Sequence, residues 1–503
     1  MKKLFLFSTS LMFVLISYGQ NISDAVRYST GEIQGTARFR AMSGAFGALG
    51  GDMSAVSLNP AGSAIFNHSH TSLSISSLNK DNDTNYFGNS NNSSNSTIDL
   101  NQLGAAFVFK NSNEDSLWGK FVIGLSYEQL QNYDDDFFAS GTSNTSIDSY
   151  FLANAQGLRL DEISAFDGET ISQAYGDIGA VYGFTHQQAF LGYESFILEP
   201  DSNTDDNTSY FSNIAPGDFY QEYSYAATGY NGKFSVNAAV QYDKNIHLGI
   251  NLNSHFINYE RSTYLFEENN NDGSLINEVG FENNLYTTGT GFSFQLGGIA
   301  KLNETIRIGF SYDSPIWYTI SEETTQYLAT YGDGGDISRV LNPQVINIFP
   351  DYKIQTPAKI TGSAALVLNK RGIISFDYSR KDYSNTKFKP ESDSYFASQN
   401  NIINTNLKAA NTYRIGGELR HKQLSFRGGY RFEESPYKDT SFYGDLKGFS
   451  LGLGYSFGNT KLDLAYENSE RDINHQLYQV GLTNSAKINS TNSNVTLSLS
   501  MAL

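Results

Sequence analysis

Two histidines and two acidic stretches have the spacing that comes nearest to a metal site. His68 and His70 lie at i and i+2, so both would face one side of a strand, but no third histidine or acidic partner accompanies them. The run 134–136 (Asp-Asp-Asp) would suit a divalent cation, although such runs are more often solvated loops. Residues 81–83 (Asp-Asn-Asp) begin like a calcium loop and lack its later glycine and glutamate. We predict no metal site.

Covalent catalysis has little support in this chain. It contains no cysteine, which removes disulfides, thiol nucleophiles and thiolate ligands. Gly44, Gly47, Gly50 and Gly51 invite comparison with a dinucleotide loop, but no strand precedes them and their spacing is not G-x-G-x-x-G. Tight packing is the better interpretation of these glycines. We predict no catalytic residue, no cofactor and no enzyme, and leave open a site assembled only in space from distant Ser, His and Asp residues.

The dominant pattern in the chain is the alternation of apolar residues with small or polar ones. Between Phe449 and Phe457, every second residue is Phe, Leu or Tyr, and the residues between them are Ser or Gly. About 14 segments from Thr71 onward show this period of two. Tight turns, as at 243–245, alternate with long connections, of which 131–225 is the longest. The pattern predicts an all-β fold, a transmembrane antiparallel β-barrel of about 14 strands. A soluble sandwich or propeller is the alternative.

Two of the long connections carry expectations of their own. The connection 79–101 contains a low-complexity run, GNSNNSSNST at 88–97, which predicts a flexible external loop. The connection 131–225 is too long to be bare coil. Its apolar stretches at 149–158 and 186–198 predict short helices. These helices would form a lid or first docking site at the barrel mouth, or would simply pack over the rim.

Composition and the N-terminus indicate where the chain resides. The 33 Tyr and 35 Phe against 2 Trp fit aromatic girdles at membrane interfaces. A net charge of −18 excludes nucleic acid as a partner. Met1-Lys2-Lys3 and the apolar run 4–18 predict a signal peptide at residues 1–19, because the run is too short to span a bilayer. We expect a monomer that crosses the bacterial outer membrane several times, surrounded by its lipid, with both termini in the periplasm.

Residues 20–70 differ from the rest of the chain and precede the strands. The stretch Arg38–Gly62 is compact and rich in small residues. Ser23 and Asp52 would cap two short helices, the second of which would stop near Pro60. We predict that residues 20–70 form a partly helical hatch that plugs a barrel made by residues 71–503, whose long loops are extracellular.

The order of several segments resembles the outer-membrane long-chain fatty acid transporter family of the FadL/TodX type. The most specific part is Asn59, Pro60, Ala61 and Gly62 after a run of Ala and Gly, which is similar to the NPA motif of the family's N-terminal hatch. Further similar segments follow at 306–316, 356–366, 374–384, 413–437 and 449–467. The resemblance covers most of the mature chain, and the family's fourteen strands agree with the count from alternation.

The resemblance implies passive uptake of hydrophobic small molecules such as long-chain fatty acids. In the family, ligand is captured at the extracellular end, the hatch shifts, and ligand leaves sideways through a gap at a kinked strand. By this resemblance Asn59–Gly62 would anchor the hatch against the kinked wall, which is compatible with Pro60 ending a helix that Asn59 caps. An outer-membrane lipid-acting enzyme and a surface receptor or adhesin are the alternative functions.

The same resemblance suggests residues for the path itself. Phe39, Met42, Phe46 and Leu49 are candidates for its apolar lining, and equally for the core of the hatch. The wall kink is expected in the third strand, near Gly124.

Overall fold

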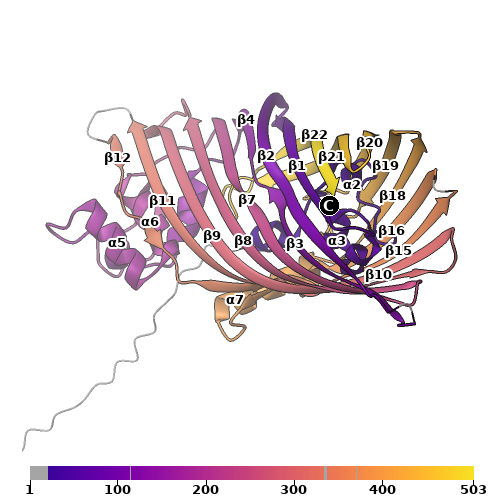
Figure 1. Ribbon diagram of the computed structural model, residues 1–503. Coiled ribbons are helices and arrows are strands. Elements are labelled where there is room, and N and C mark those ends of the chain that lie inside the picture. The colour runs from indigo at the N-terminus through magenta and orange to yellow at the C-terminus, as the bar shows by residue number, and fades with distance from the viewer. Residues whose placement is uncertain (1–20, 114, 333–336, 370) are drawn as a thin grey trace, which may run out of the picture.

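The computed structural model describes residues 21–113, 115–332, 337–369 and 371–503, so the predicted signal peptide at 1–19 lies outside the described residues. The strands form a barrel that lies on its side in Figure 1, with short N-terminal helices inside it. No helix in the described part of the chain is long and apolar enough to cross a membrane.

Antiparallel pairing runs around the wall and closes it, which confirms the predicted barrel. The wall has 14 strands, and β1 pairs with β22 from His70↔Ala502 to Asn85↔Lys487. The uninterrupted strands are β1 (His70–Tyr86), β2 (Asn89–Lys110), β7 (Phe219–Tyr242), β8 (Ile246–Glu268), β9 (Ile276–Lys301), β16 (Gly372–Asp382), β18 (Ala409–His421), β19 (Leu424–Glu433), β20 (Leu446–Ser456), β21 (Thr460–Gln476) and β22 (Ser485–Ala502).

Three wall strands are interrupted. The third consists of β3 (Trp118–Asn132) and β4 (Asp135–Ser143), the seventh of β10 (Ile306–Asp313) and β11 (Trp317–Gly332), and the eighth of β12 (Arg339–Leu341), β13 (Asn347–Ile348), β14 (Tyr352–Gln355) and β15 (Lys359–Leu368). Pro315 and Pro357 lie at interruptions of the seventh and eighth strands, where a residue without an N–H cannot donate to the ladder. A short strand, β17 (Lys387–Lys389), pairs with β14.

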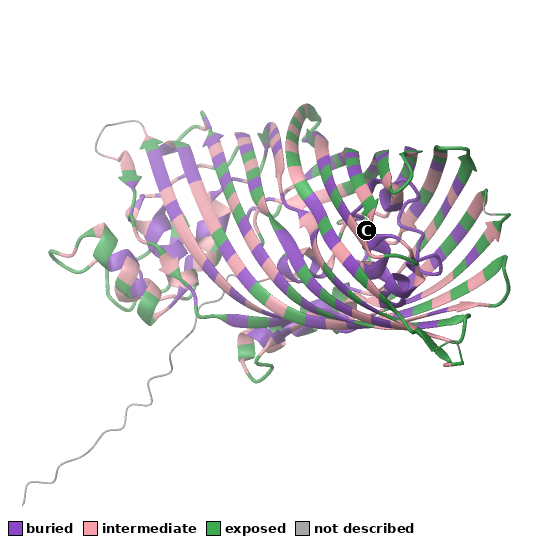
Figure 2. Ribbon diagram, in the orientation of Figure 1, coloured by how far each residue is buried: buried purple, intermediate pink, exposed green. Residues whose placement is uncertain are grey.

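Alternation sorts the side chains of each strand to two faces. In β20, Phe449, Leu451 and Leu453 are exposed on the outside of the barrel, whereas Ser450 is buried. The same banding of buried and exposed residues runs along the wall strands in Figure 2. An apolar outer face toward lipid and a polar inner face are what a membrane barrel requires.

The prediction of a flexible loop at 79–101 is wrong. β1 and β2 continue through this stretch and meet in a two-residue turn, Phe87-Gly88, whose φ angles are 48° and 87°. Two successive positive φ values match a type I′ hairpin turn, which preserves the twist of the flanking strands. The Ser- and Asn-rich run lacks the alternation of apolar and polar residues, so its sequence gave no signal that it forms a strand.

The long connection between β4 and β7 contains the two predicted helices and one that was not predicted. Its elements are α4 (Asp148–Ala155), η2 (Leu160–Glu162), α5 (Ile171–Val181), α6 (Phe184–Glu194), β5 (Leu198–Pro200) and β6 (Tyr210–Ser212). Phe151, Phe190 and Leu191 are fully buried in one apolar cluster with wall residues such as Leu265 and Phe281. The helices therefore pack over the rim at this end of the barrel, which we call the loop end.

The opposite end carries the short turns at 243–245, 302–305, 369–371, 422–423 and 457–459, and we call it the turn end. The N-terminal residues lie inside the barrel and contain α1 (Ile22–Ser29), α2 (Ala37–Arg40), α3 (Met53–Leu58) and η1 (Pro60–Ile65). We call residues 21–35 the arm and residues 36–66 the plug. Between β16 and β18 lie η3 (Tyr383–Asn385) and α7 (Ser394–Asn406), and α7 packs Phe396 and Ile403 into one apolar cluster with α1.

Candidate functional site

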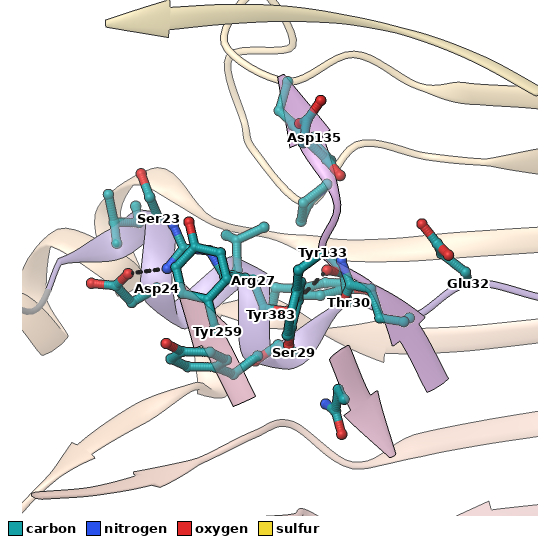
Figure 3. Close-up of a pocket in the computed structure, with 18 of the residues that line it drawn as sticks. Ser23, Asp24, Arg27, Ser29, Thr30, Glu32, Tyr133, Asp135, Tyr259 and Tyr383 are labelled. Carbon is teal, nitrogen blue, oxygen red and sulfur yellow. Dashed lines mark hydrogen bonds and ion pairs between the residues drawn. The ribbon is translucent and has the colours of Figure 1, made fainter. Parts of the chain in front are cut away.

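A cavity of about 1220 Å³ lies inside the barrel between the arm, the plug and the wall. Tyr225, Tyr259, Tyr383 and Tyr443 contribute aromatic faces to its lining. The Arg27 guanidinium of α1 lies 4.3 Å from the centre of the Tyr259 ring, and Figure 3 shows the two side by side. The lining therefore combines apolar surface with buried charge, as a site for an amphiphilic molecule would.

The plug lies between this cavity and the turn end. Phe39, Arg40 and Leu58 line the cavity, while the carbonyl oxygens of Leu49 and Phe66 accept hydrogen bonds from Arg307 and Lys120 near the turn end. The plug thus occupies the lumen below the cavity.

The four residues considered for an apolar path pack mainly on one another. Phe39, Met42, Phe46 and Leu49 are all buried in one cluster with Ile33, Ala48, Ala55, Leu58 and Ala365. Of the four, Phe39 also lines the cavity. Their position fits the core of the plug.

Asn59–Gly62 packs against β8 and β9 with backbones almost in contact. A Cβ on Gly297 would lie 2.1 Å from the Asn59 Oδ1, and one on Gly249 would lie 2.4 Å from the Pro60 carbonyl carbon. Asn59 Nδ2 donates to the carbonyl oxygens of Gly47 (2.7 Å) and Gly298 (3.1 Å). Its own Oδ1 accepts from the Ala61 N–H, so Asn59 both ends α3 and begins η1. The motif joins plug to wall at glycines of continuous strands.

Ion pairs join the plug to strands on another side of the barrel. Arg38 Nε lies 2.8 Å from the Glu418 Oε2 of β18, and Arg40 lies 3.0 Å from Glu467 of β21. Arg427 of β19 bridges Glu418 (2.7 Å) and Asp463 (2.6 Å). We call these six residues the ionic anchor; the Glu418 side chain has no solvent exposure.

A seam without backbone pairing lies between β2 and the interrupted third strand. The β2–β3 ladder ends at Gln102↔Glu128. Beyond it, β2 pairs with β1 and β4 pairs with β7, and no ladder between β2 and β4 exists among the described residues. The arm reaches this free edge, where the Glu32 N–H donates to the Leu130 carbonyl oxygen over 3.0 Å.

Side chains bridge the seam in place of the missing ladder. Lys80 Nζ of β1 lies 2.8 Å from the Asp135 Oδ2 of β4, and Asn132 Nδ2 donates to the Asp99 Oδ2 of β2 over 2.6 Å. Lys80 and Asp135 also line the cavity, and Figure 3 shows Asp135 and Tyr133 along the interrupted strand near α1. The cavity therefore reaches the one stretch of the third strand where side chains alone hold the wall together.

The interruption of the third strand lies beyond the residue where a kink was expected. Gly124 pairs with Ala106 on one side and Asn237 on the other, without a shift in register. The register shifts between Gln129 and Gln131, and the strand breaks at residues 133–134. We therefore propose that the wall kink lies at this break and not at Gly124.

The residues considered for metal binding are occupied in other ways. The His70 ring stacks on Phe66 at 4.8 Å. The Asp134 Oδ1 accepts from the Gly229 N–H, and Asp135 pairs with Lys80. Within the described ranges, no group of three or more His, Cys, Asp or Glu is placed to hold a metal ion.

Residues 235–501, more than half of the chain, match the family model of the outer membrane protein transport proteins (OMPP1/FadL/TodX). The chain belongs to this family. It is an outer-membrane β-barrel of a family that transports hydrophobic compounds. No curated protein sequence gives a significant match.

Solved structures share the fold at low sequence identity. A FadL homologue from Pseudomonas aeruginosa is 12% identical, with a TM-score of 0.54 over 94% of this chain and 99% of that one. The toluene transporter TbuX of Ralstonia pickettii is 14% identical, with a TM-score of 0.50 over 93% and 99%. The P. putida toluene transporter TodX is 12% identical, with a TM-score of 0.50 over 94% and 99%.

Sequence reasoning missed the charged residues of the cavity and seam. Arg261 and Arg471 line the cavity, and the side chain of neither makes an ion pair or hydrogen bond to any described residue. Arg471 instead lies over the Tyr443 ring at 4.1 Å. The sequence signal available for these residues was a charged side chain at an inward-facing position of an alternating strand. Alternation does not show which inward-facing residues of different strands are in contact.

Proposed function

We propose that this protein takes up hydrophobic molecules with an anionic head group, such as long-chain fatty acids, by passive transport without a chemical step. It acts as a monomer, with the loop end outside the cell and the turn end in the periplasm. Ligand is captured at the loop end, enters the cavity and leaves sideways into lipid when the N-terminal residues move.

The observation that carries this proposal is the cavity itself, which lies above the plug and beside the seam. Its volume of about 1220 Å³ slightly exceeds the range of about 300–1,000 Å³ typical of small-molecule pockets. Plug residues form part of its lining on the turn-end side, and the seam borders it laterally. A ligand that is poorly soluble in water gains about 25 cal/mol per Å² of apolar surface that it buries. Lateral exit would keep that surface out of water.

Arg261 and Arg471 support an anionic head group over a neutral hydrocarbon. Each places a permanent positive charge at the cavity without a carboxylate within 4.0 Å in the described chain. Hydrogen bonds to a charged partner are worth about 1.5–3 kcal/mol each. A carboxylate head group would supply that partner, whereas an aromatic hydrocarbon would not.

Uptake of labelled oleate and labelled toluene into cells lacking their own fatty acid transporter tests the proposal. We expect the wild-type protein to transport oleate. Arg261→Met and Arg471→Met together should reduce oleate uptake by about tenfold or more, since about 1.4 kcal/mol corresponds to tenfold. A matched control replaces Arg380→Met and Arg159→Met, two arginines that do not line the cavity.

Equal loss in the cavity variant and the control would contradict the head-group assignment, as would toluene uptake that exceeds oleate uptake in the wild type. No uptake of either compound by a correctly inserted barrel would overturn the transport proposal itself.

A further inference from the structure

The turn end of the barrel carries a rim of unpaired cations. Six of them, Lys110, Lys120, Lys244, Lys301, Arg371 and Lys422, lie in or beside the turns, and none has a carboxylate within 4.0 Å among the described residues. Lys110, Lys244, Arg371 and Lys422 are exposed. The acidic residues in the same turns are fewer, with Asp115, Asp243 and Glu304 described. The rim is therefore positively charged and uncompensated within the protein.

Exposed apolar side chains, which we call the apolar ring, lie at the same end of the barrel as these cations. Phe109, Leu117, Trp118, Leu302 and Phe457 are each at least half exposed, and each lies at the turn end of its strand or in the adjoining turn. Aromatic and apolar side chains at a strand end mark the depth at which hydrocarbon meets head groups. The ring thus places the cations at the level of the lipid head groups.

The loop end has the opposite charge. Residues 144–218, which connect β4 to β7 there, contain 12 Asp and Glu but one Arg and no Lys. Lys and Arg near a membrane surface are attracted to anionic lipids, and acidic residues are repelled by them. Because the turn end is positively charged and the loop end is negatively charged, we expect anionic lipids to bind at the turn end.

We propose that the turn-end rim binds the phosphodiester head groups of anionic phospholipids in the leaflet that it faces, which is the periplasmic leaflet if the orientation of the proposed function holds. The cations are spread over the turns after β2, β7, β9, β15 and β18, with one or two at each. A free phosphate ion needs donors that converge on one point, whereas a ring of lipids needs charges spaced around the wall. The geometry fits lipids.

Native mass spectrometry of the full-length purified barrel, equilibrated with equal amounts of phosphatidylglycerol and phosphatidylethanolamine, tests this proposal. We expect the wild type to retain severalfold more phosphatidylglycerol. The variant Lys110→Gln, Lys244→Gln, Arg371→Gln, Lys422→Gln should lose that preference. The control Lys353→Gln, Arg380→Gln, Lys447→Gln, Lys487→Gln removes four exposed cations away from the turn end and should keep it.

No preference in the wild type, or equal loss in the control, would overturn the proposal. Displacement of phosphatidylglycerol by millimolar inorganic phosphate would show a free-phosphate site and would also overturn it. An acidic soluble protein that binds the rim more tightly than the lipid would do the same.

Oleate uptake by the rim variant separates this inference from the transport proposal. The four substituted residues do not line the cavity, so uptake should stay within about twofold of the wild type. If the wild type prefers phosphatidylglycerol but does not take up oleate, the transport proposal is contradicted while the rim assignment remains supported.

Discussion

The N-terminal residues contact the wall in two different ways. The plug is held by the ionic anchor on β18–β21, whose charges are almost completely buried, and by close backbone contact with β8 and β9. The arm meets the free edge of β3 through the backbone hydrogen bond from Glu32 to Leu130, whereas its helix α1 packs Val26 and Tyr28 into an apolar cluster with wall residues. Because breaking a buried ion pair is costly and releasing one hydrogen bond is not, we expect the stretch around Glu32 to leave the wall more readily than the plug.

This difference changes the expected role of Asn59–Gly62. The resemblance suggested that the motif anchors the hatch against the kinked wall. Its closest contacts are with β8 and β9, and hydrogen bonds also join Pro60 to Asn237 of β7 and Asn59 to Phe310 of β10. We therefore expect the motif to hold the plug still, while movement of the stretch around Glu32 exposes the seam.

The largest effect should come from removing the central charge of the ionic anchor. Glu418→Gln leaves Arg38, Arg420 and Arg427 without their shared carboxylate. Breaking a buried pair in this way costs about 3–5 kcal/mol. Denaturant unfolding of the purified barrel measures the loss, with the turn residue Glu304→Gln as control. A change below about 0.5 kcal/mol in Glu418→Gln would show that the anchor does not hold the plug.

A second prediction probes the close contact with β9 through two neighbouring glycines. In Gly297→Ala the new Cβ would overlap the Asn59 side chain, whereas in Gly298→Ala the nearest atom is 3.7 Å away. Overpacking costs about 1–3 kcal/mol, so Gly297→Ala should be destabilised by that amount and Gly298→Ala much less. Equal unfolding midpoints for the two variants would contradict the close packing of Asn59–Gly62.

Breaking an ion pair at the seam should change the rate of transport more than the stability of the protein. Lys80 and Asp135 are partly exposed, and such pairs contribute about 0–1 kcal/mol. Lys80→Gln should therefore raise oleate uptake by up to about fivefold at nearly unchanged stability. Lys359→Gln serves as control, because Lys359 forms a pair of similar length, 2.7 Å from Asp313, between β10 and β15, which backbone pairing joins directly. Uptake that rises equally in both variants would show that the seam does not control ligand exit.

The smallest effect concerns the arm carboxyl. Burial raises the pKa of Glu32 above its usual 4.5, against the opposing charges of Lys80, Arg40 and Arg431. The docked arm therefore favours the protonated form, so docking is strongest below pH 4.5 and weakens as pH rises through the raised pKa. Hydrogen exchange at residues 30–35 should accelerate over this window in the wild type. In Glu32→Gln it should vary only with the intrinsic exchange rate; an unchanged pH profile there would contradict the assignment.

The sequence patterns predicted the wall much better than the site. Alternation identified Phe449–Phe457 and its counterparts because lipid demands one apolar face. It failed at 79–101, where β1 and β2 continue as polar strands, and it missed α5 and α7. The seam joins Lys80 and Asp99 to residues of the third strand. Periodicity along one strand carries no information about such contacts between strands.

A reversible crosslink across the seam shows whether ligand leaves the cavity by this route. The chain has no cysteine, so Asp99→Cys with Asn132→Cys places a single thiol pair across the seam, and Ser235→Cys with Asn253→Cys places one across the paired strands β7 and β8. Both pairs would be joined by a short cleavable thiol crosslinker in inserted barrels, and oleate uptake measured before and after reduction. We expect the seam crosslink to block uptake, reduction to restore it, and the control crosslink to have no effect. Full uptake through a barrel with a crosslinked seam would contradict exit through the seam.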